Sequence, residues 1–254
     1  MGRLTDKVAI ITGAAGGIGA AAARLFVAEG ARVMLADVAE PPLRDLVASL
    51  GDAADYQICD VSTERHVQDL VAATVARFGG VDVLFANAGV EGRVAPLLEQ
   101  STQDLERVLH VNLFGVWYGI KHAAPELARR GGGAVVVTSS VAGLVGSAGL
   151  GPYIASKHAV LGLVKTAAIE LAPLRIRVNA VNPGPIANRM MHSIEAQAAP
   201  DAPAAVRAGF EQLVPLHRYG TNEEVAHMAA FLASDDASYC TGGAYLVDGG
   251  FVAG

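Results

Sequence analysis

The chain has 254 residues, of which 52% are hydrophobic and 17% charged, a composition that excludes an intrinsically disordered protein and suits one α/β domain. Its 19 Lys and Arg residues against 25 Asp and Glu give a net charge of −6, which argues against nucleic-acid binding. Two cysteines, Cys59 and Cys240, cannot build a disulfide framework, and no His/Cys group has metal-ligand spacing. With no secretory leader or membrane span in the sequence, we expect a cytoplasmic protein without a metal.

Short apolar runs alternate with amphipathic segments of helical length, the order that βαβ units produce. Several runs are unbroken β-branched sequences, which indicates a parallel sheet covered on both faces. The predicted strands are Val8–Thr12, Val33–Asp37, Tyr56–Cys59, Val83–Ala86, Ala134–Thr138, Arg177–Val181 and Ala244–Val247. The predicted helices are Gly17–Glu29, Pro42–Leu50, Thr63–Phe78, Ser101–Arg130, Tyr153–Leu171 and Asn222–Ala233. We therefore expect one doubly wound α/β domain with a seven-stranded sheet over residues 1–254.

One segment departs from this alternation. Several prolines and Ala/Gln-rich sequence separate the sixth predicted strand from the last predicted helix. Because so long a connection in a compact domain is usually functional, we expect a mobile flap over a ligand site at about residues 184–216. The alternative is a surface insertion with one or two short helices and no part in catalysis.

A glycine-rich turn, residues 12–19, follows the first predicted strand and opens the first helix. Glycines such as Gly13, Gly17 and Gly19 let the backbone approach a ligand closely, and the helix start attracts a pyrophosphate. An acidic residue, Asp37, lies 18 positions beyond Gly19, which fits the context of a dinucleotide site. The turn could otherwise be an ordinary tight strand-to-helix connection.

Three sites near later strand ends add to this prediction. Asp37 could accept hydrogen bonds from both adenosine ribose hydroxyls and would repel a 2′-phosphate, so NAD is expected over NADP. No Arg or Lys stands at Gly16 or Val38 to bind that phosphate. Asp60 could bind adenine or serve as a helix cap near Ser62. Asn87-Ala88-Gly89 falls at the carboxyl edge of the sheet, where its small residues would admit a cofactor.

Tyr153 and Lys157 lie four residues apart on one predicted helix, so their side chains share a face. Ser139 and Ser140 end the preceding strand, and Asn112 lies within the long helix before it. Together these residue types suit proton exchange with an alcohol beside a nicotinamide. Lys157 and the nicotinamide charge are expected to lower the Tyr153 pKa, and Lys157 to hold the nicotinamide ribose. Ser140 would bind the substrate oxygen.

Asn112 is the expected holder of a water that connects Lys157 to solvent. The alternative is a surface Asn that bonds to its own helix. The seven histidines have no convincing metal-ligand companions and are not assigned a role.

These ordered motifs resemble the classical short-chain dehydrogenase/reductase family over essentially the whole chain. The resemblance implies a single Rossmann-type domain, hydride transfer between NAD(P) and an alcohol/carbonyl pair, and a homotetramer. It also identifies Ser140, rather than Ser139, as the catalytic serine beside Asn112, Tyr153 and Lys157. The implied cofactor-binding residues are Gly13, Ala15, Gly17, Ile18, Gly19, Asp37, Asp60, Val61, Asn87, Ala88, Gly89, Tyr153, Lys157, Pro183, Gly184, Ile186 and Asn188.

The chain departs from the family pattern at two positions. Ala86 stands where an Asn is frequent before Asn87. Asn188 stands where the family has a Thr that contacts the nicotinamide carboxamide, and we expect the Asn to substitute because its amide both donates and accepts hydrogen bonds.

The substrate pocket is expected to be mostly apolar and adaptable, although its methionines could equally pack the flap. The predicted substrate-binding residues are Ser140, Leu144, Leu150, Tyr153, Met190 and Met191. We expect a secondary alcohol, cyclic diol or hydroxysteroid-like substrate, with oxidation by NAD favoured. The alternatives are a 3-oxoacyl thioester reductase and, in another class, a non-catalytic NAD-binding scaffold or sensor. For assembly, small residues at Gly115, Ala123, Ala159, Gly162 and Ala167 are expected to face outward on the long helices.

Overall fold

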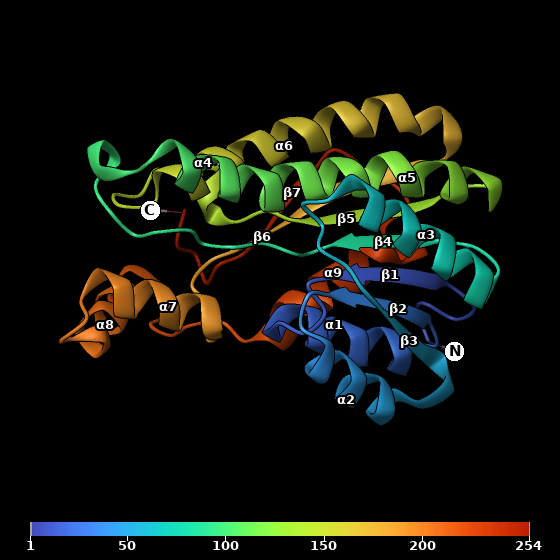
Figure 1. The fold of residues 1–254 in the computed structure, drawn as a ribbon, viewed down its shortest axis with the longest axis horizontal. Coiled ribbons are helices and arrows are strands. Elements are labelled where there is room, and N and C mark those ends of the chain that lie inside the picture. Colours follow the sequence, from blue (N-terminus) through green and yellow to red (C-terminus); the bar gives the residue numbers. More distant parts are fainter. Residues whose placement is uncertain (1, 254) are drawn as a thin grey trace.

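The computed structural model describes residues 2–253, so the end residues of the predicted domain, Met1 and Gly254, lie outside the described part. Seven parallel strands form one sheet in the order β3-β2-β1-β4-β5-β6-β7 (Figure 1). The order reverses between β1 and β4, which is the switch point of a doubly wound Rossmann-type sheet. The strands are β1 (Val8–Thr12), β2 (Arg32–Asp37), β3 (Ala54–Ile58), β4 (Val83–Ala86), β5 (Gly133–Thr138), β6 (Ile176–Pro183) and β7 (Ala244–Val247).

Helices cover both faces of this sheet, as the unbroken apolar strands predict. On one face lie α1 (Gly17–Ala28), α2 (Glu40–Leu50) and α9 (Asn222–Ala233), packed on strand residues such as Ile11 and Phe85. On the other lie α3 (Glu64–Phe78), α5 (Gly115–Arg129) and α6 (Gly151–Leu171), packed on Ile10 and Leu84. Neighbouring strand residues thus enter opposite cores, so both faces of the sheet are apolar.

The predicted helix Ser101–Arg130 is divided. It consists of α4 (Thr102–Leu109), a π-helical turn at His110–Phe114, and α5. Apolar periodicity does not reveal a π turn, because the extra residue shifts the face by less than one turn. Several boundaries also differ by one or two residues. For example, α2 begins at Glu40 rather than Pro42, β3 is Ala54–Ile58, α6 begins at Gly151, and β6 continues to Pro183.

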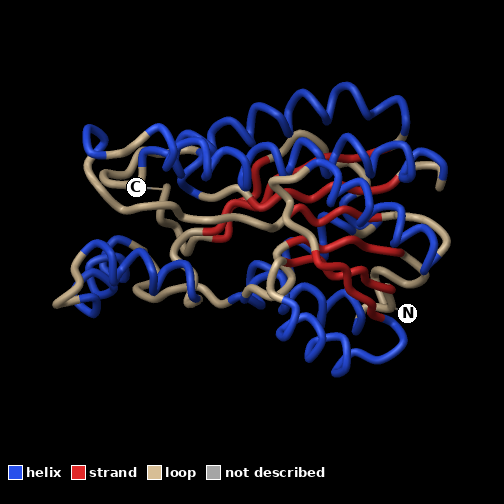
Figure 2. The backbone as a smooth tube through the Cα atoms, in the orientation of Figure 1, coloured by secondary structure: helices blue, strands red, loops and turns tan. Residues whose placement is uncertain are grey.

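The segment predicted as a flap contains α7 (Arg189–Ala198) and α8 (Pro203–Leu213). Both helices lie apart from the sheet, on the side where the loops after the strands gather (Figures 1 and 2). Two short helices were the alternative expected for a surface insertion, while the cavity described below places α7 beside a site. Within residues 2–253, no helix is both long and apolar enough to cross a bilayer.

Candidate cofactor and active site

A cavity of about 820 Å³ opens at the carboxyl ends of the strands. It extends without a break from Asp37 at the end of β2 to Phe210 of α8. The fold brings most of the predicted site residues to this one cavity, although up to 178 positions, from Gly13 to Met191, separate them in the chain. The predicted residues that line it are Gly13, Ala15, Gly17, Ile18, Asp37, Asp60, Val61, Asn87, Ala88, Gly89, Ser140, Leu150, Tyr153, Lys157, Pro183, Gly184, Ile186, Asn188, Met190 and Met191.

Three predicted site residues do not line the cavity. Leu144 is 44% exposed and does not line the cavity, whereas its neighbour Val145 does. The expectation for Leu144 is thus corrected, because the short helical turn at Val141–Gly143 sets which side chains after Ser140 face inward. Gly19 packs under the glycine turn, where an added Cβ would lie 2.2 Å from the Gly13 carbonyl oxygen. Asn112 is fully buried behind the cavity wall.

The glycine turn is shaped for close approach. Gly13 has a φ of +65°, and a Cβ there would lie 2.8 Å from the Ala88 Cα. Gly16 is the N-cap of α1 and provides no side chain to satisfy the first N–H groups of the helix. These donors and the helix dipole face the cavity, so the turn fits the pyrophosphate of a dinucleotide.

The two acidic residues predicted at the adenosine end both line the cavity but have local partners. Asp37 accepts hydrogen bonds from the Ala15 N–H at 3.1 Å and the Ala39 N–H at 3.2 Å. Asp60 accepts from both the backbone N–H and the hydroxyl of Ser62, at 2.9 and 2.7 Å. Asp37 thereby ties the end of β2 to the glycine turn, and each of its carboxylate oxygens keeps a further lone pair for a ribose hydroxyl.

Asn87 joins three strand ends. Its amide donates to the Thr12 carbonyl at 3.1 Å, and its Oδ1 accepts from the Thr138 hydroxyl at 3.0 Å. The Thr12 hydroxyl in turn accepts from the backbone N–H groups of Asn87 and Ala88. The ends of β1, β4 and β5 are thus fixed against one another at the floor of the cavity. The sequence did not identify Thr12 and Thr138 as members of this network.

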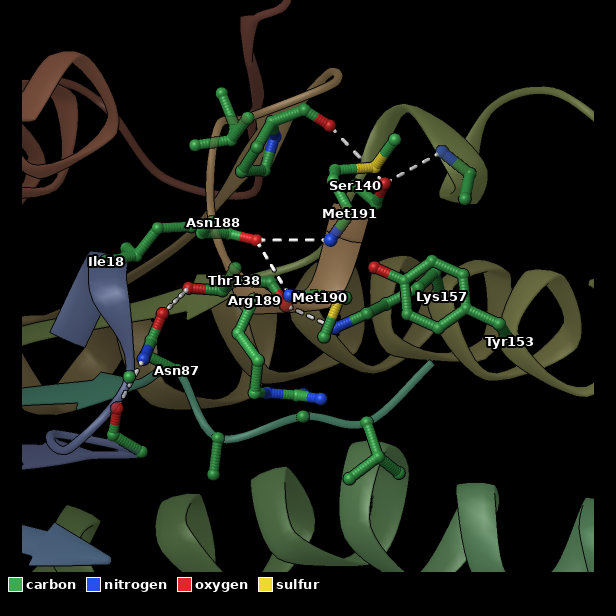
Figure 3. Close-up of a pocket in the computed structure, with 18 of the residues that line it drawn as sticks. Ile18, Asn87, Thr138, Ser140, Tyr153, Lys157, Asn188, Arg189, Met190 and Met191 are labelled. Atoms are coloured by element: carbon green, nitrogen blue, oxygen red, sulfur yellow. Dashed lines mark hydrogen bonds between the residues drawn. The ribbon is translucent and has the colours of Figure 1, made fainter. Parts of the chain in front are cut away.

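Tyr153 and Lys157 project from the first turns of α6 into the cavity (Figure 3). The Lys157 Nζ lies 5.6 Å from the Tyr153 ring centroid and donates a 2.8 Å hydrogen bond to the Thr138 carbonyl. The ammonium therefore faces the end of β5 as well as the ring.

Burial is the main cause of the pKa shifts of Tyr153 and Lys157. It raises the pKa of Tyr153 to about 12, although a hydrogen bond with Ser140 acts in the opposite direction. Burial also lowers the pKa of Lys157 to about 8. Without a bound dinucleotide, burial thus outweighs the hydrogen bond with Ser140 at Tyr153, and the lowering of its pKa by Lys157 and the nicotinamide charge stays a prediction.

The two adjacent serines have different partners. The Ser140 hydroxyl faces the cavity, donates to the Pro183 carbonyl at 3.3 Å and accepts from the Ala142 N–H at 3.1 Å. The Ser139 hydroxyl donates to the Lys157 carbonyl at 3.2 Å, within the buried contact between β5 and α6. Asn182, which belongs to the Asn182-Pro183-Gly184 motif that carries the family resemblance but was assigned no site role from the sequence, donates to the Ser140 carbonyl at 2.7 Å and holds this turn in place.

Asn112 lies in the π turn and connects the loop after β4 with α6. Its Oδ1 accepts from the Val90 N–H at 2.8 Å, and its amide donates to the Val90 carbonyl and the Ser156 hydroxyl, each at 3.0 Å. A Cβ on Gly89 would lie 3.4 Å from Asn112 Oδ1 and 3.6 Å from Lys157 Nζ, so both groups border the space that a side chain at Gly89 would fill. The structure gives Asn112 a positioning contact, and the water relay stays a prediction.

Asn188 is the N-cap of α7. Its Oδ1 accepts from the backbone N–H groups of Met190 at 3.0 Å and Met191 at 3.3 Å (Figure 3). Its amide nitrogen lies 3.4 Å from Asn222 Oδ1. The oxygen is thus used by the helix and one amide hydrogen by Asn222, so the second amide hydrogen remains for a ligand.

The far end of the cavity is apolar. Met190 and Met191 pack with Leu150, Tyr153 and Ile194 in a small cluster over the tyrosine ring. The apolar lining residues that the sequence did not identify are Ile154 of α6, Ile194 of α7, Leu213 of α8 and Phe251 in the C-terminal segment.

The chain matches a protein-family model described as "Enoyl-(Acyl carrier protein) reductase" over residues 13–252. It is similar to a levodione reductase from Leifsonia aquatica, 38% identical over 98% of this chain and 95% of the relative. A cyclohexanol dehydrogenase from Acinetobacter is 37% identical, covering 98% and 96%. A 3-oxoacyl-[acyl-carrier-protein] reductase from Thermotoga maritima is 39% identical, covering 98% and 99%. The crystal structure of levodione reductase superposes with a TM-score of 0.95 at 37% identity and covers 98% of each chain.

The fold and the cavity define a nicotinamide-dependent oxidoreductase that acts on CH–OH groups and interconverts an alcohol with its carbonyl compound. The chain belongs to the short-chain dehydrogenase/reductase family, as its ordered motifs predict.

Proposed function

We propose that the protein is an NAD-dependent dehydrogenase of cyclic secondary alcohols that acts by proton exchange at Tyr153. The observation that supports this most is the placement of Tyr153, Ser140 and Lys157 in one cavity, between the glycine turn and an apolar end. The names of the levodione and cyclohexanol relatives point to small cyclic substrates. The apolar cluster of Leu150, Met190, Met191 and Ile194 suits such a ring.

The preference for NAD rests on the adenosine end of the cavity. Asp37 lies there with its carboxylate fixed by two backbone N–H groups, and its neighbour Val38 offers no positive charge. A ribose 2′-phosphate would meet a carboxylate without a cationic partner, so NADP is disfavoured. Oxidation is the direction we propose, because it is the usual use of NAD.

A bound nicotinamide supplies the hydride acceptor and, in its oxidised form, a positive charge. In this proposal Tyr153 removes the hydroxyl proton of the substrate, and Ser140 hydrogen-bonds the same oxygen. Lys157 holds the nicotinamide ribose. Asn188 would donate its second amide hydrogen toward the carboxamide, and Ile186 would provide a backbone contact.

The alternative of a 3-oxoacyl thioester reductase is supported by the Thermotoga relative, which is as similar as the others. A non-catalytic scaffold is opposed by the complete set of Ser140, Tyr153, Lys157 and Asn112. We also propose that residues 184–216 form a mobile flap over the site and that the protein is cytoplasmic.

We also propose a homotetramer, but its subunits would meet through other residues of the long helices than those expected from the sequence. Gly115, Ala123 and Ala167 do not face outward as expected, since all three are buried within the described chain. The exposed large apolar side chains on α5 and α6 are instead Trp117 and Ile169, with Phe114 exposed in the π turn before α5.

The proposed activity is tested by following nicotinamide absorbance with cyclohexanol, a cyclic diol, a 3-hydroxysteroid and a 3-oxoacyl thioester, each with NAD(H) and NADP(H). The expected result is NAD-linked oxidation of one or more cyclic alcohols. Asp37→Ser should lower the NAD-over-NADP preference in kcat/KM by roughly tenfold or more, the value of one charged hydrogen bond. Fast NADPH-linked reduction of the thioester, with no cyclic alcohol oxidised, would contradict both the cofactor and the substrate assignment.

A further inference from the structure

An ion pair lies beside the cavity, with Arg189 lining it and Glu91 behind Arg189. Arg189, the first residue of α7, binds Glu91 through both guanidinium nitrogens, at 3.0 and 3.1 Å. The two residues are 98 positions apart in the chain. Figure 3 shows Arg189 extending from α7 toward the loop that follows β4. A second contact, from the Val94 N–H to Gln197 Oε1 at 3.1 Å, joins the same loop to α7.

The two partners differ in exposure. The Glu91 side chain is only 8% exposed, whereas that of Arg189 is 71% exposed and lines the cavity. Burial alone would raise the pKa of the Glu91 carboxyl, but hydrogen bonds from Arg189 and Ser193 hold its pKa below the ordinary value. Glu91 is therefore a fixed, ionised carboxylate that depends on Arg189 for its partner.

The pairing of Glu91 with Arg189 bears on the charge that a substrate would meet in the cavity. Among the described residues that line the cavity, the cationic ones are Lys157, at the reacting centre, and Arg189. An unpaired Arg189 would present a planar fork of donors suited to a carboxylate or phosphate. The Glu91 carboxylate already accepts a hydrogen bond from each of the two terminal nitrogens of this guanidinium. An anionic substrate would have to displace it and leave a buried carboxylate without its cation.

We propose that Glu91 is a specificity-determining residue, which neutralises Arg189 and thereby restricts the site to uncharged alcohols and ketones. The inference rests on the proposed function for its substrate class and adds a residue that excludes anionic analogues of that class. Specificity here comes from a competing internal ligand, because the chain itself provides the carboxylate.

The test compares two probes of the same shape, cyclohexanecarboxylate and cyclohexanecarboxamide. Their dissociation constants are measured by calorimetry on the full-length enzyme saturated with the dinucleotide. In Glu91→Gln the carboxylate should bind roughly tenfold or more tightly relative to the carboxamide than in the wild type, since one charge-assisted hydrogen bond becomes available. The double variant Glu91→Gln/Arg189→Gln should lose this gain.

Arg189→Gln provides a second measurement if Glu91→Gln does not fold, because it alters an exposed side chain. It leaves the Glu91 charge unpaired, so the carboxylate should bind several-fold more weakly relative to the carboxamide. An unchanged ratio of the two constants in these variants would overturn the inference and leave the ion pair as a structural link between α7 and the loop. Because binding is measured, the result is independent of the activity screen: failure to oxidise any cyclic alcohol would refute the proposed function alone.

Discussion

At the scale of single residues, the buried pair of Tyr153 and Lys157 lies at the centre of the site. Burial acts against the charged form of each, so the Tyr153 pKa rises to about 12 and the Lys157 pKa falls to about 8. The protein holds an ammonium that destabilises the fold at neutral pH, which is typical of a residue retained for function rather than stability.

Replacing Lys157 with Met should therefore stabilise the dinucleotide-free protein at pH 7. The lowering of the Lys157 pKa from 10.5 to about 8 destabilises the folded wild type by about 3 kcal/mol at pH 7. The variant avoids this cost but loses about 1 kcal/mol of stability with the hydrogen bond to Thr138. The net gain of about 2 kcal/mol corresponds to a Tm higher by ~4–8 °C, measurable by calorimetry.

The pH dependence of this difference follows from the sign of the shift. Between pH 8 and 10.5 the unfolded wild type keeps the lysine proton that the folded state has lost, so wild-type stability rises with pH in that window. The Tm advantage of Lys157→Met should thus shrink from pH 7 to pH 10. A variant less stable than the wild type at pH 7, with a difference that does not vary with pH, would contradict the burial argument.

Residue spacing identified the chemical groups of the site but not their partners. The four-residue spacing of Tyr153 and Lys157 requires a shared helix face, and that relation survives folding. The hydrogen bond from Asn182 to the Ser140 carbonyl joins β6 to the turn after β5, 42 positions earlier, so no local pattern encodes it. Whether Leu144 or Val145 faces the cavity likewise depends on the backbone of residues 141–143.

At the scale of elements, α7 begins at the cavity because Asn188 caps it. Asn188→Ala should cost about 1 kcal/mol of unfolding free energy through loss of the cap. Asn188→Ser, which restores a capping oxygen, should stay within a few tenths of a kcal/mol of the wild type. Urea denaturation measures both. Equal losses in the two variants would show that capping is not what the Asn188 side chain contributes.

Strands and amphipathic helices followed from apolar periodicity, since burial on both faces requires unbroken β-branched runs such as Val135–Val137. The π turn at His110–Phe114 and the helices α7 and α8 did not. The residues of a π turn are of the same types as those of an α-helix, so composition does not reveal it. Here Asn112 in the turn hydrogen-bonds with Val90 and Ser156, which are distant in the sequence. In α7 and α8, the prolines nearby obscured the pattern, although Pro203 is an ordinary first residue of a helix.

At the scale of the whole molecule, the alternation of strands and helices predicted the sheet, whereas contacts between distant segments were not encoded locally. The pair Glu91–Arg189 spans 98 positions and depends on where α7 lies relative to the loop after β4. The apolar side chains left exposed on the long helices also emerge only from the folded chain. Trp117 is 52% exposed on α5 and Ile169 is 76% exposed on α6.

If this surface joins subunits, Trp117→Lys should convert the proposed homotetramer to smaller species, because a charge would be buried without a partner. Light scattering after size-exclusion chromatography measures the mass at micromolar concentration. The chain has one tryptophan, so its wild-type fluorescence should also shift to longer wavelength on dilution to monomers. A monomeric wild type, or a tetramer that persists in Trp117→Lys, would refute this surface as the interface.

The most direct test of the account is the turnover of Tyr153→Phe with a cyclic alcohol found in the screen, together with its dinucleotide affinity. Loss of the hydroxyl should lower kcat by roughly 10²- to 10⁴-fold, the contribution of a general acid–base group, while the dissociation constant for NAD changes by only a few fold. A variant that retained wild-type turnover would contradict the role of Tyr153 in proton exchange.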